Sequence, residues 1–249
     1  MYSNSNDEVT KFLQEHALDM PSLYASYDFD GDRHKDGFPK MFALECRITA
    51  AAKRNSFDRD DLIEIAKWGG NDRNIPRIEE NERRFKFTLY YQKKPLNWLI
   101  EEPESYISVV KARVHGYDAT YSSKLLHFAV PSVFGMLDTW LVRTFGMGDR
   151  NFSKYKFLQL AATNQKNGWS ISTPKKHWPS EYGTWIRILH NIADTLNDKK
   201  ISCPHPENFI KSGMRVKEFW FPADVEIALF SYAYEGRGER LIQELKGVG

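Results

Sequence analysis

The chain has little cysteine, no long apolar run and no excess of one charge. Only two cysteines, Cys46 and Cys203, occur among its 249 residues. They make no disulfide framework and are too few for the four thiolates of an iron–sulfur cluster. No stretch approaches the eighteen apolar residues of a membrane span, and the N-terminal MYSNSNDEVTKF lacks the charged-then-apolar pattern of a secretion signal. We therefore expect a cytoplasmic protein with no membrane partner.

The charges nearly balance, with 35 basic and 33 acidic residues and a formal net charge of +2. Dedicated nucleic-acid binders are usually more basic, so the total slightly favours a protein-binding role. Placement is more informative than the total. Short basic clusters occur at 93–94, 111–113, 154–156, 175–177 and 211–217. The first four can rim a central cleft, or each can be an ordinary solvated surface.

What the chain does contain is apolar and aromatic residues at helical spacing. Hydrophobic residues are 41% and aromatic residues 14% of the sequence, enough for a sizeable core. Periodicity, caps and terminal glycines predict helices over Asp7–His16, Lys40–Arg54, a segment ending at Trp68, Glu181–Asn197 and Ala223–Tyr234. No repeat or clear boundary is present. The sequence predicts an all-α, mainly helical fold in a single globular domain over 1–249.

Two patterns that suggest a metal are weak. Cys203 and His205 can be grouped with His177 and His190, but their spacing matches no standard zinc site. The loop at 30–37, DGDRHKDG, resembles a calcium loop without the acid required at the twelfth position. We expect no metal and no cofactor.

The most informative segment is 105–146, which reads as two helices joined by a glycine turn. Ser105–Val114 has apolar residues at helical spacing, and Gly116 then tolerates the positive φ of a tight turn. Asp118 is positioned to cap a second helix over Ala119–Ala129, which ends before Pro131. The unit is predicted to be a helix, a hairpin and a helix.

An aspartate follows this unit at the start of a third, short helix. Asp138 comes after an apolar link and precedes Thr139-Trp140-Leu141-Val142-Arg143, and Gly146 closes the segment. A carboxylate at a helix N-terminus is stabilised by the free N–H groups there. Such an aspartate is common in helical proteins, and a glycine connector between helices is common too.

At these residues the chain resembles the helix-hairpin-helix DNA glycosylase superfamily. Members share a glycine hairpin, a helix, and then an apolar-Asp-Thr-x-x-x-Arg-x-x-x-Gly segment, matched here by Leu137–Gly146 with one residue fewer before the glycine. The resemblance implies a two-lobed fold with a central cleft. It also implies that Asp138 is catalytic: it stabilises positive charge on the deoxyribose C1′ and helps water attack as the base leaves.

Residues of the hairpin are the DNA-binding candidates that the resemblance implies, namely Gly116, Tyr117, Thr120 and Lys124. Asp118 stands where many members have a second glycine, and its charge would repel phosphate. Thr120 stands where bifunctional members carry a Schiff-base lysine, and a threonine cannot do amine chemistry. Lys124 lies one turn further on. These departures favour a monofunctional enzyme without strand-cutting lyase activity.

Aromatic residues supply the candidates for a base pocket or a duplex wedge. Trp140 replaces the histidine often found two residues after the aspartate. Trp169, His177 and Trp178 lie in a predicted loop rich in Asn, Gly, Ser and Pro that ends at Ser180. Exposed aromatic residues in a loop can stack on a flipped base or enter the duplex, although most tryptophans simply pack.

Three hypotheses follow from the sequence. The first is a monofunctional DNA glycosylase, acting as a monomer on duplex DNA with a flipped damaged or modified base, in repair or in defence against phage. The second is a DNA-binding protein of the same fold without catalysis. The third is an unrelated helical protein with a protein-binding face. The excised base cannot be read from the sequence, because the residues that select it are scattered along the chain.

Overall fold

The chain folds into a mainly helical protein, as the sequence predicts. The computed structural model describes residues 3–147, 155–165, 168–174 and 177–246. Its α-helices are α1 Ser3–His16, α2 Met20–Ala25, α3 Pro39–Lys53, α4 Arg59–Trp68, α5 Ile75–Glu79, α6 Trp98–Glu101, α7 Pro103–Arg113, α8 Ala119–Ala129, α9 Thr139–Phe145, α10 Ser180–Asp198, α11 Glu207–Lys211 and α12 Pro222–Lys246. Short 3₁₀ turns cover His34–Asp36 and Asp72–Asn74. Within these described segments, no helix is long and apolar enough to cross a membrane.

Strands are short and form separate two-stranded antiparallel pairs. They are β1 Asp28–Phe29 with β2 Asp32–Arg33, β3 Phe57–Asp58 with β4 Arg84–Phe85, β5 Tyr90–Tyr91 with β6 Lys94–Pro95, and β7 Ala162–Gln165 with β8 Gly168–Ile171. Pairs of this size add little stability by themselves, so the helices carry the core.

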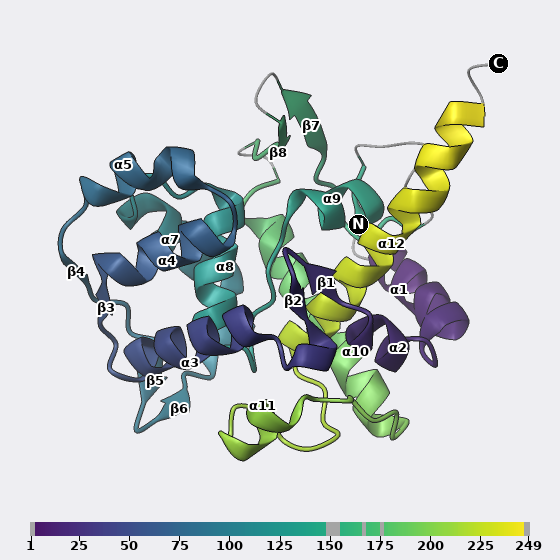
Figure 1. Cartoon of the computed structure of the whole chain (residues 1–249), viewed down its shortest axis with the longest axis horizontal. Helices are drawn as coiled ribbons and strands as arrows, with labels where there is room; N and C mark the ends of the chain where they lie inside the picture. The colour runs from purple at the N-terminus through teal and green to yellow at the C-terminus, as the bar shows by residue number, and fades with distance from the viewer. Residues whose placement is uncertain (1–2, 148–154, 166–167, 175–176, 247–249) are drawn as a thin grey trace.

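The helices gather around α8 and α10 (Figure 1). On one side, α3, α4 and α7 pack against α8; on the other, α12 packs against α2, α9 and α10. Helix α10 also contacts α7 and so joins the two sides. The hairpin β1–β2 lies over α12 near the middle of the molecule (Figure 1). Segments far apart in sequence therefore meet around the N-terminus of α9.

Helix α10 holds the segment before α9 in place. Trp185 is fully buried, as its place on an apolar stripe predicts, and its Nε1 donates a 2.8 Å hydrogen bond to the Met136 carbonyl. Tyr182, also fully buried, donates to the Gly135 carbonyl at 3.3 Å. Two rigid aromatic anchors thus fix the backbone just ahead of Asp138.

Most predicted helices are confirmed, and two predictions need correction. The second helix of the hairpin unit runs over Ala119–Ala129 as expected. Part of the predicted loop before Ser180 is instead the strand β8, which pairs with β7 just ahead of that loop. The last helix continues to Lys246 rather than ending at Tyr234.

Candidate functional site

The glycine turn between α7 and α8 packs on the preceding helix α5. Gly116 has φ +91°, and a Cβ there would lie 3.0 Å from Ile78 Cγ1 and 3.1 Å from Arg77 Cβ. Asn81 reinforces this contact by accepting from the His115 N–H at 2.7 Å and donating to the His115 carbonyl at 2.8 Å. Only glycine satisfies both the backbone angle and the close approach.

Helix α8 begins as its sequence predicts and is tied to the segment that carries Asp138. Asp118 caps it by accepting from the Tyr121 N–H at 3.0 Å. Ser123 Oγ accepts from the Leu137 N–H at 2.9 Å. This bond from mid-helix to the residue before Asp138 places the aspartate against the face of α8 that carries Lys124.

Asp138 is the N-cap of α9, as predicted, and is half-buried. Its Oδ1 accepts from the Leu141 N–H at 2.9 Å. Burial raises the pKa of the Asp138 carboxyl, while the Leu141 N–H and the nearby Lys124 ammonium oppose that rise. A carboxylate with a raised pKa, held by its backbone, is a suitable base or electrostatic stabiliser.

Asp138 lines a small enclosed pocket, which we call the inner pocket. Side chains from α4, α8, α12 and the segments before α9 and around β1 converge on it. Its lining residues are Tyr27, Phe29, Trp68, Lys124, Met136, Asp138, Glu226, Ile227 and Phe230. Apolar and aromatic walls around a few ionisable groups are typical of ligand sites.

Lys124 extends into this pocket from α8 and is 7% exposed. Its Nζ lies 4.9 Å from the centre of the Trp68 ring and 5.0 Å from that of Tyr121, both cation–π contacts. Burial lowers the pKa of the Lys124 amine, against the opposing effect of Asp138 and Glu226. A buried amine with a lowered pKa can act as a nucleophile more readily than a surface lysine.

Glu226 reaches the inner pocket from α12 and is 3% exposed. Its Oε2 lies 3.3 Å from His127 Nδ1, yet the contact lacks hydrogen-bond geometry, and among the described residues neither atom has a hydrogen-bond partner. Burial, followed by the charge of Asp138, raises the pKa of Glu226 well above its usual range. Burial lowers the pKa of His127. We therefore treat the pair as a neutral acid beside a neutral imidazole, not as an ion pair.

A glycine lets α12 come this close. A Cβ at Gly135 would lie 2.9 Å from Glu226 Cβ and would also overlap the Leu189 side chain. The Met136 N–H bonds to the Glu226 carboxyl. Adjacent residues of one segment thus place Glu226 beside Asp138.

Aromatic rings close the inner pocket. Phe29 contacts the Trp68 ring at a centroid distance of 6.3 Å and the Phe230 ring at 5.8 Å. The free volume inside is about 20 Å³, room for about one water molecule. This volume is smaller than a nucleobase, so the pocket as it stands has no room for one.

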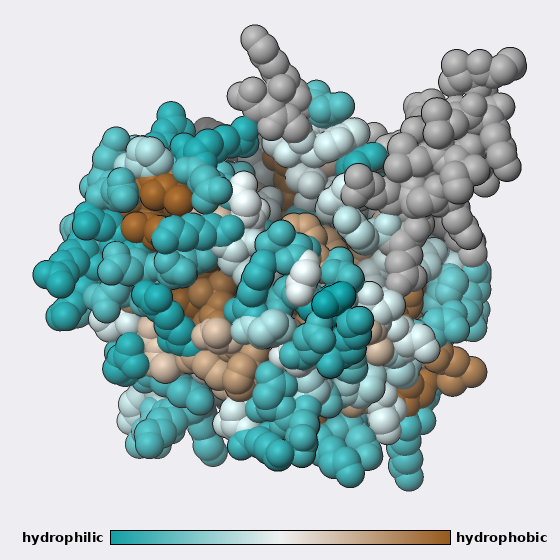
Figure 2. Space-filling view, in the orientation of Figure 1, coloured by the Kyte–Doolittle hydropathy of each residue, from teal (hydrophilic) through white to brown (hydrophobic). Residues whose placement is uncertain are grey.

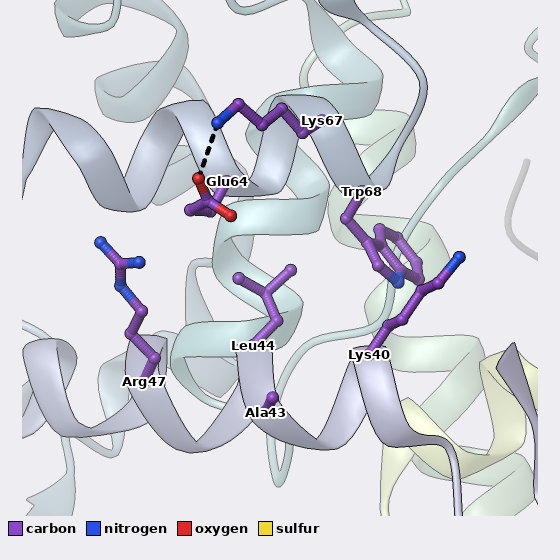
Figure 3. A pocket seen from close by; sticks show the side chains of 7 residues that line it. All are labelled: Lys40, Ala43, Leu44, Arg47, Glu64, Lys67 and Trp68. Carbon is purple, nitrogen blue, oxygen red and sulfur yellow. Dashed lines mark hydrogen bonds and ion pairs between the residues drawn. The ribbon is translucent and has the colours of Figure 1, made fainter. Parts of the chain in front are cut away.

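Trp68 also lines a second, open groove between α3 and α4, which we call the outer groove (Figure 3). Its volume is about 320 Å³, and its lining residues are Lys40, Ala43, Leu44, Arg47, Glu64, Lys67 and Trp68. Apolar surface is visible between these helices in Figure 2. The side chains of Lys40 and Trp68 lie next to each other at one end of the groove (Figure 3).

The cations of the outer groove are paired with acids. Lys67 binds Glu64 at 3.0 Å, as the dashed line in Figure 3 shows. Arg47 pairs with Asp61 and Lys40 with Asp30, each at 2.7 Å. The charges therefore balance locally, and this groove offers little net attraction for a phosphate backbone.

The predicted DNA-binding residues are spread over different environments. Tyr117 is buried and its hydroxyl donates to the Leu62 carbonyl at 2.8 Å, so its ring is turned into the protein. Gly116 and Thr120 are half-buried. Lys124 is inside the inner pocket and can meet only a nucleotide that enters it.

The predicted aromatic candidates lie outside the lining of the inner pocket. Trp169, 37% exposed, stacks with Arg143, whose guanidinium carbon is 3.9 Å from its ring centre and 4.8 Å from that of Trp140. His177 is half-buried. The expectation of an exposed ring is wrong for Trp178, which is 8% exposed because it packs on Tyr182 and under Lys111.

A cluster with metal-ligand chemistry lies elsewhere. Ligand atoms of Cys203, His205 and Asp224 lie within 4.8 Å of one another. Asp224, however, binds the guanidinium of the buried Arg215 at 2.8 Å and caps α12 through the Phe221 N–H at 2.9 Å. Arg215 also pairs with the buried Glu45. A fixed cation beside Asp224 opposes a second cation, so this cluster is structural.

A comparison of the chain with protein-family models, with curated proteins and with solved structures found no match.

Proposed function

We propose that the protein is a DNA glycosylase that hydrolyses the N-glycosidic bond of a damaged or modified base, with Asp138 as the catalytic carboxylate. The observation that carries the proposal is the convergence of Asp138, Lys124 and Glu226 in one aromatic-walled pocket. The resemblance of segment 105–146 to the helix-hairpin-helix superfamily supports it. Flat aromatic walls suit a stacked base, and the proposal requires the pocket to widen beyond its volume of about 20 Å³ to admit one.

The proposed reaction breaks the bond between C1′ and the base nitrogen. The bond's electron pair leaves with the base, which gains a proton, and C1′ acquires oxocarbenium character. The Asp138 carboxylate stabilises that positive charge and accepts a proton from the water that attacks C1′. The position of Asp138 as a helix cap limits its movement, so little reorganisation is needed during the reaction.

The test is release of bases from a panel of duplexes bearing uracil, hypoxanthine, 8-oxoguanine, 3-methyladenine and 5-hydroxymethylcytosine, together with modified phage DNA. Abasic sites are counted for the wild type, for Asp138→Asn and for Asp118→Asn. Both substitutions keep a helix cap, since asparagine caps about as well as aspartate. Only Asp138→Asn is expected to lower release strongly, by about two to three orders of magnitude. Equal activity in the wild type and Asp138→Asn would exclude the proposal.

A second candidate activity is strand cleavage by a lyase, and the position of Lys124 favours it. An amine in the same pocket as Asp138 can attack C1′, expel the base and form an imine with the sugar. Loss of the C2′ proton then releases the 3′ phosphate. Borohydride would trap the imine as a protein–DNA adduct in the wild type but not in Lys124→Met. Base release without an adduct would support the monofunctional reaction.

The same experiments distinguish the remaining hypotheses. Salt-sensitive binding to duplex DNA without base release would favour a DNA-binding protein that lacks catalysis. Absence of binding as well would favour a helical protein with a different kind of partner. The balanced charges of the outer groove are compatible with that outcome.

A further inference from the structure

We propose that Glu226 recognises the base: its carboxylic acid group forms paired hydrogen bonds with a nucleobase edge that carries an acceptor next to an N–H donor. This inference rests on the proposed function and identifies the substrate class of the same pocket. It concerns selection of the base, whereas the proposed role of Asp138 is to stabilise charge on the deoxyribose.

Burial without a partner points to a ligand. Glu226 is 3% exposed and lines the inner pocket, but its Oε2 has no hydrogen-bond partner among the described residues. Leaving a buried polar atom unsatisfied is costly, and such atoms are rare unless they have a role. Since Glu226 lines the inner pocket, a ligand bound there can supply the missing partner.

The neighbours of Glu226 favour its neutral form. Asp138, the N-cap of α9, and Asp224, which is in α12 with Glu226, oppose a further negative charge, whereas Lys124 favours it. His127 beneath it is fully buried and stays neutral because burial lowers its pKa. Tyr27 and Tyr182 also face this region, and burial, followed by the effect of Glu226, raises their pKa values. Burial is the largest of these effects, and it raises the pKa of Glu226, which favours the protonated form.

A protonated carboxyl group offers one donor and one acceptor side by side. It pairs with an edge that offers the reverse, such as a ring N–H beside a carbonyl or a ring nitrogen beside an amino group. An ionised carboxylate only accepts and would select an edge with two donors. The neutral carboxyl group should therefore select bases with an intact amide-like or amidine-like edge. It should bind less well to bases that are methylated at the ring nitrogen of that edge.

Two substitutions separate recognition from proton transfer and from charge. Glu226→Gln keeps an acceptor and a donor in nearly the same shape, but has no acidic proton and no charge. Glu226→Leu removes both hydrogen bonds. Single-turnover base release is measured for each on the panel duplexes. For the base that the wild type releases, a matched duplex carries the same base methylated at the ring nitrogen of its hydrogen-bonding edge.

We expect Glu226→Gln to stay within about threefold of the wild-type rate and Glu226→Leu to fall by about tenfold to a hundredfold. The wild type should release the methylated base more slowly by a similar factor, and Glu226→Leu should not discriminate between the two. Affinity for a duplex with a tetrahydrofuran abasic analogue should be unchanged in both variants, because that ligand has no base to read. The same measurement shows that both variants are folded.

Several outcomes would overturn the inference while leaving the proposed function intact. Wild-type rates in Glu226→Leu would show that the Glu226 carboxyl group does not contribute to base recognition. Loss of release in Glu226→Gln would mean that an acidic proton or a charge is required instead. Equal release of the methylated base would show that this edge is not recognised. Failure of the wild type on every duplex would instead reject the proposed function, and the inference with it.

Discussion

The Lys124 ammonium lies 4.9 Å from the centre of the Trp68 ring, at the boundary between the inner pocket and the outer groove. The side chain of Trp68 is partly exposed to solvent, whereas Lys124 is buried. A ligand that approaches through the outer groove would meet the indole before the amine. The contact therefore links the accessible surface to the ionisable groups behind it.

Asp138→Asn should lower base release by about two to three orders of magnitude, because an amide cannot stabilise the charge that develops at C1′. Stability should change little, since the Leu141 N–H still finds an acceptor. The matched control is Asp118→Asn, which changes the exposed cap of α8 in the same way. Single-turnover rates and thermal unfolding of both variants check this prediction.

Lys124→Met should move the acidic limb of the pH–rate profile to higher pH. The Lys124 ammonium lowers the pKa of Asp138, so its removal makes the carboxyl harder to ionise. Activity that requires ionised Asp138 is lost as pH falls through that pKa, and the loss will then begin at a higher pH. An unchanged limb in rates measured between pH 4 and 8 would show that Lys124 does not act on Asp138.

Lys124→Met should also change the pH dependence of stability. Burial lowers the pKa of Lys124 in the folded chain below the unfolded value of 10.5. The unfolded state therefore binds more protons between those two values, and wild-type stability rises with pH there. The substitution removes the cost of burying a charge, so its stabilising effect should be largest at neutral pH and shrink toward pH 10.5. Urea unfolding at several pH values measures it.

Much of the hairpin unit and of Asp138's position could be predicted from sequence, because the signals are local. Asp118 and Asp138 each precede a helix, and both act as N-caps. Gly116 follows a helix and takes positive φ. Each feature depends on neighbours a few residues away, so periodicity and capping rules are sufficient.

The inner pocket could not be predicted, because it depends on contacts between distant segments. Asp224 and Glu226 both lie near the start of a helix. From the sequence alone, each carboxylate is expected to stabilise the N-terminus of that helix. Only Asp224 does so, through the Phe221 N–H. The one sequence signal for Glu226 is an acid within an otherwise apolar helix face, and Phe29 and Trp68 carry no signal beyond their hydrophobicity.

Arg215→Met should destabilise the protein by about 3–5 kcal/mol at pH 7, because it leaves two buried carboxylates, Glu45 and Asp224, without their cation. Burial already raises the pKa of Glu45, and removal of Arg215 raises it further. The folded chain then binds more protons than the unfolded chain above about pH 4.3, so the loss should be smaller at pH 4 than at pH 7. Arg33→Met, which breaks an exposed pair with Asp36, should cost less than about 1 kcal/mol.

Gly116→Ala should cost about 1–3 kcal/mol from its backbone angle, with a further loss from contact with α5. Gly31→Ala is the matched control, because Gly31 also has positive φ, +71°, but a Cβ there meets nothing within 4 Å. The difference between the two variants in urea unfolding isolates the packing of the hairpin on Ile78 and Arg77. Equal losses would mean that the hairpin can move away from α5 at no cost. In that case the N–H groups of the turn would be free to reach a phosphate, and the DNA affinity of Gly116→Ala would become the informative measurement.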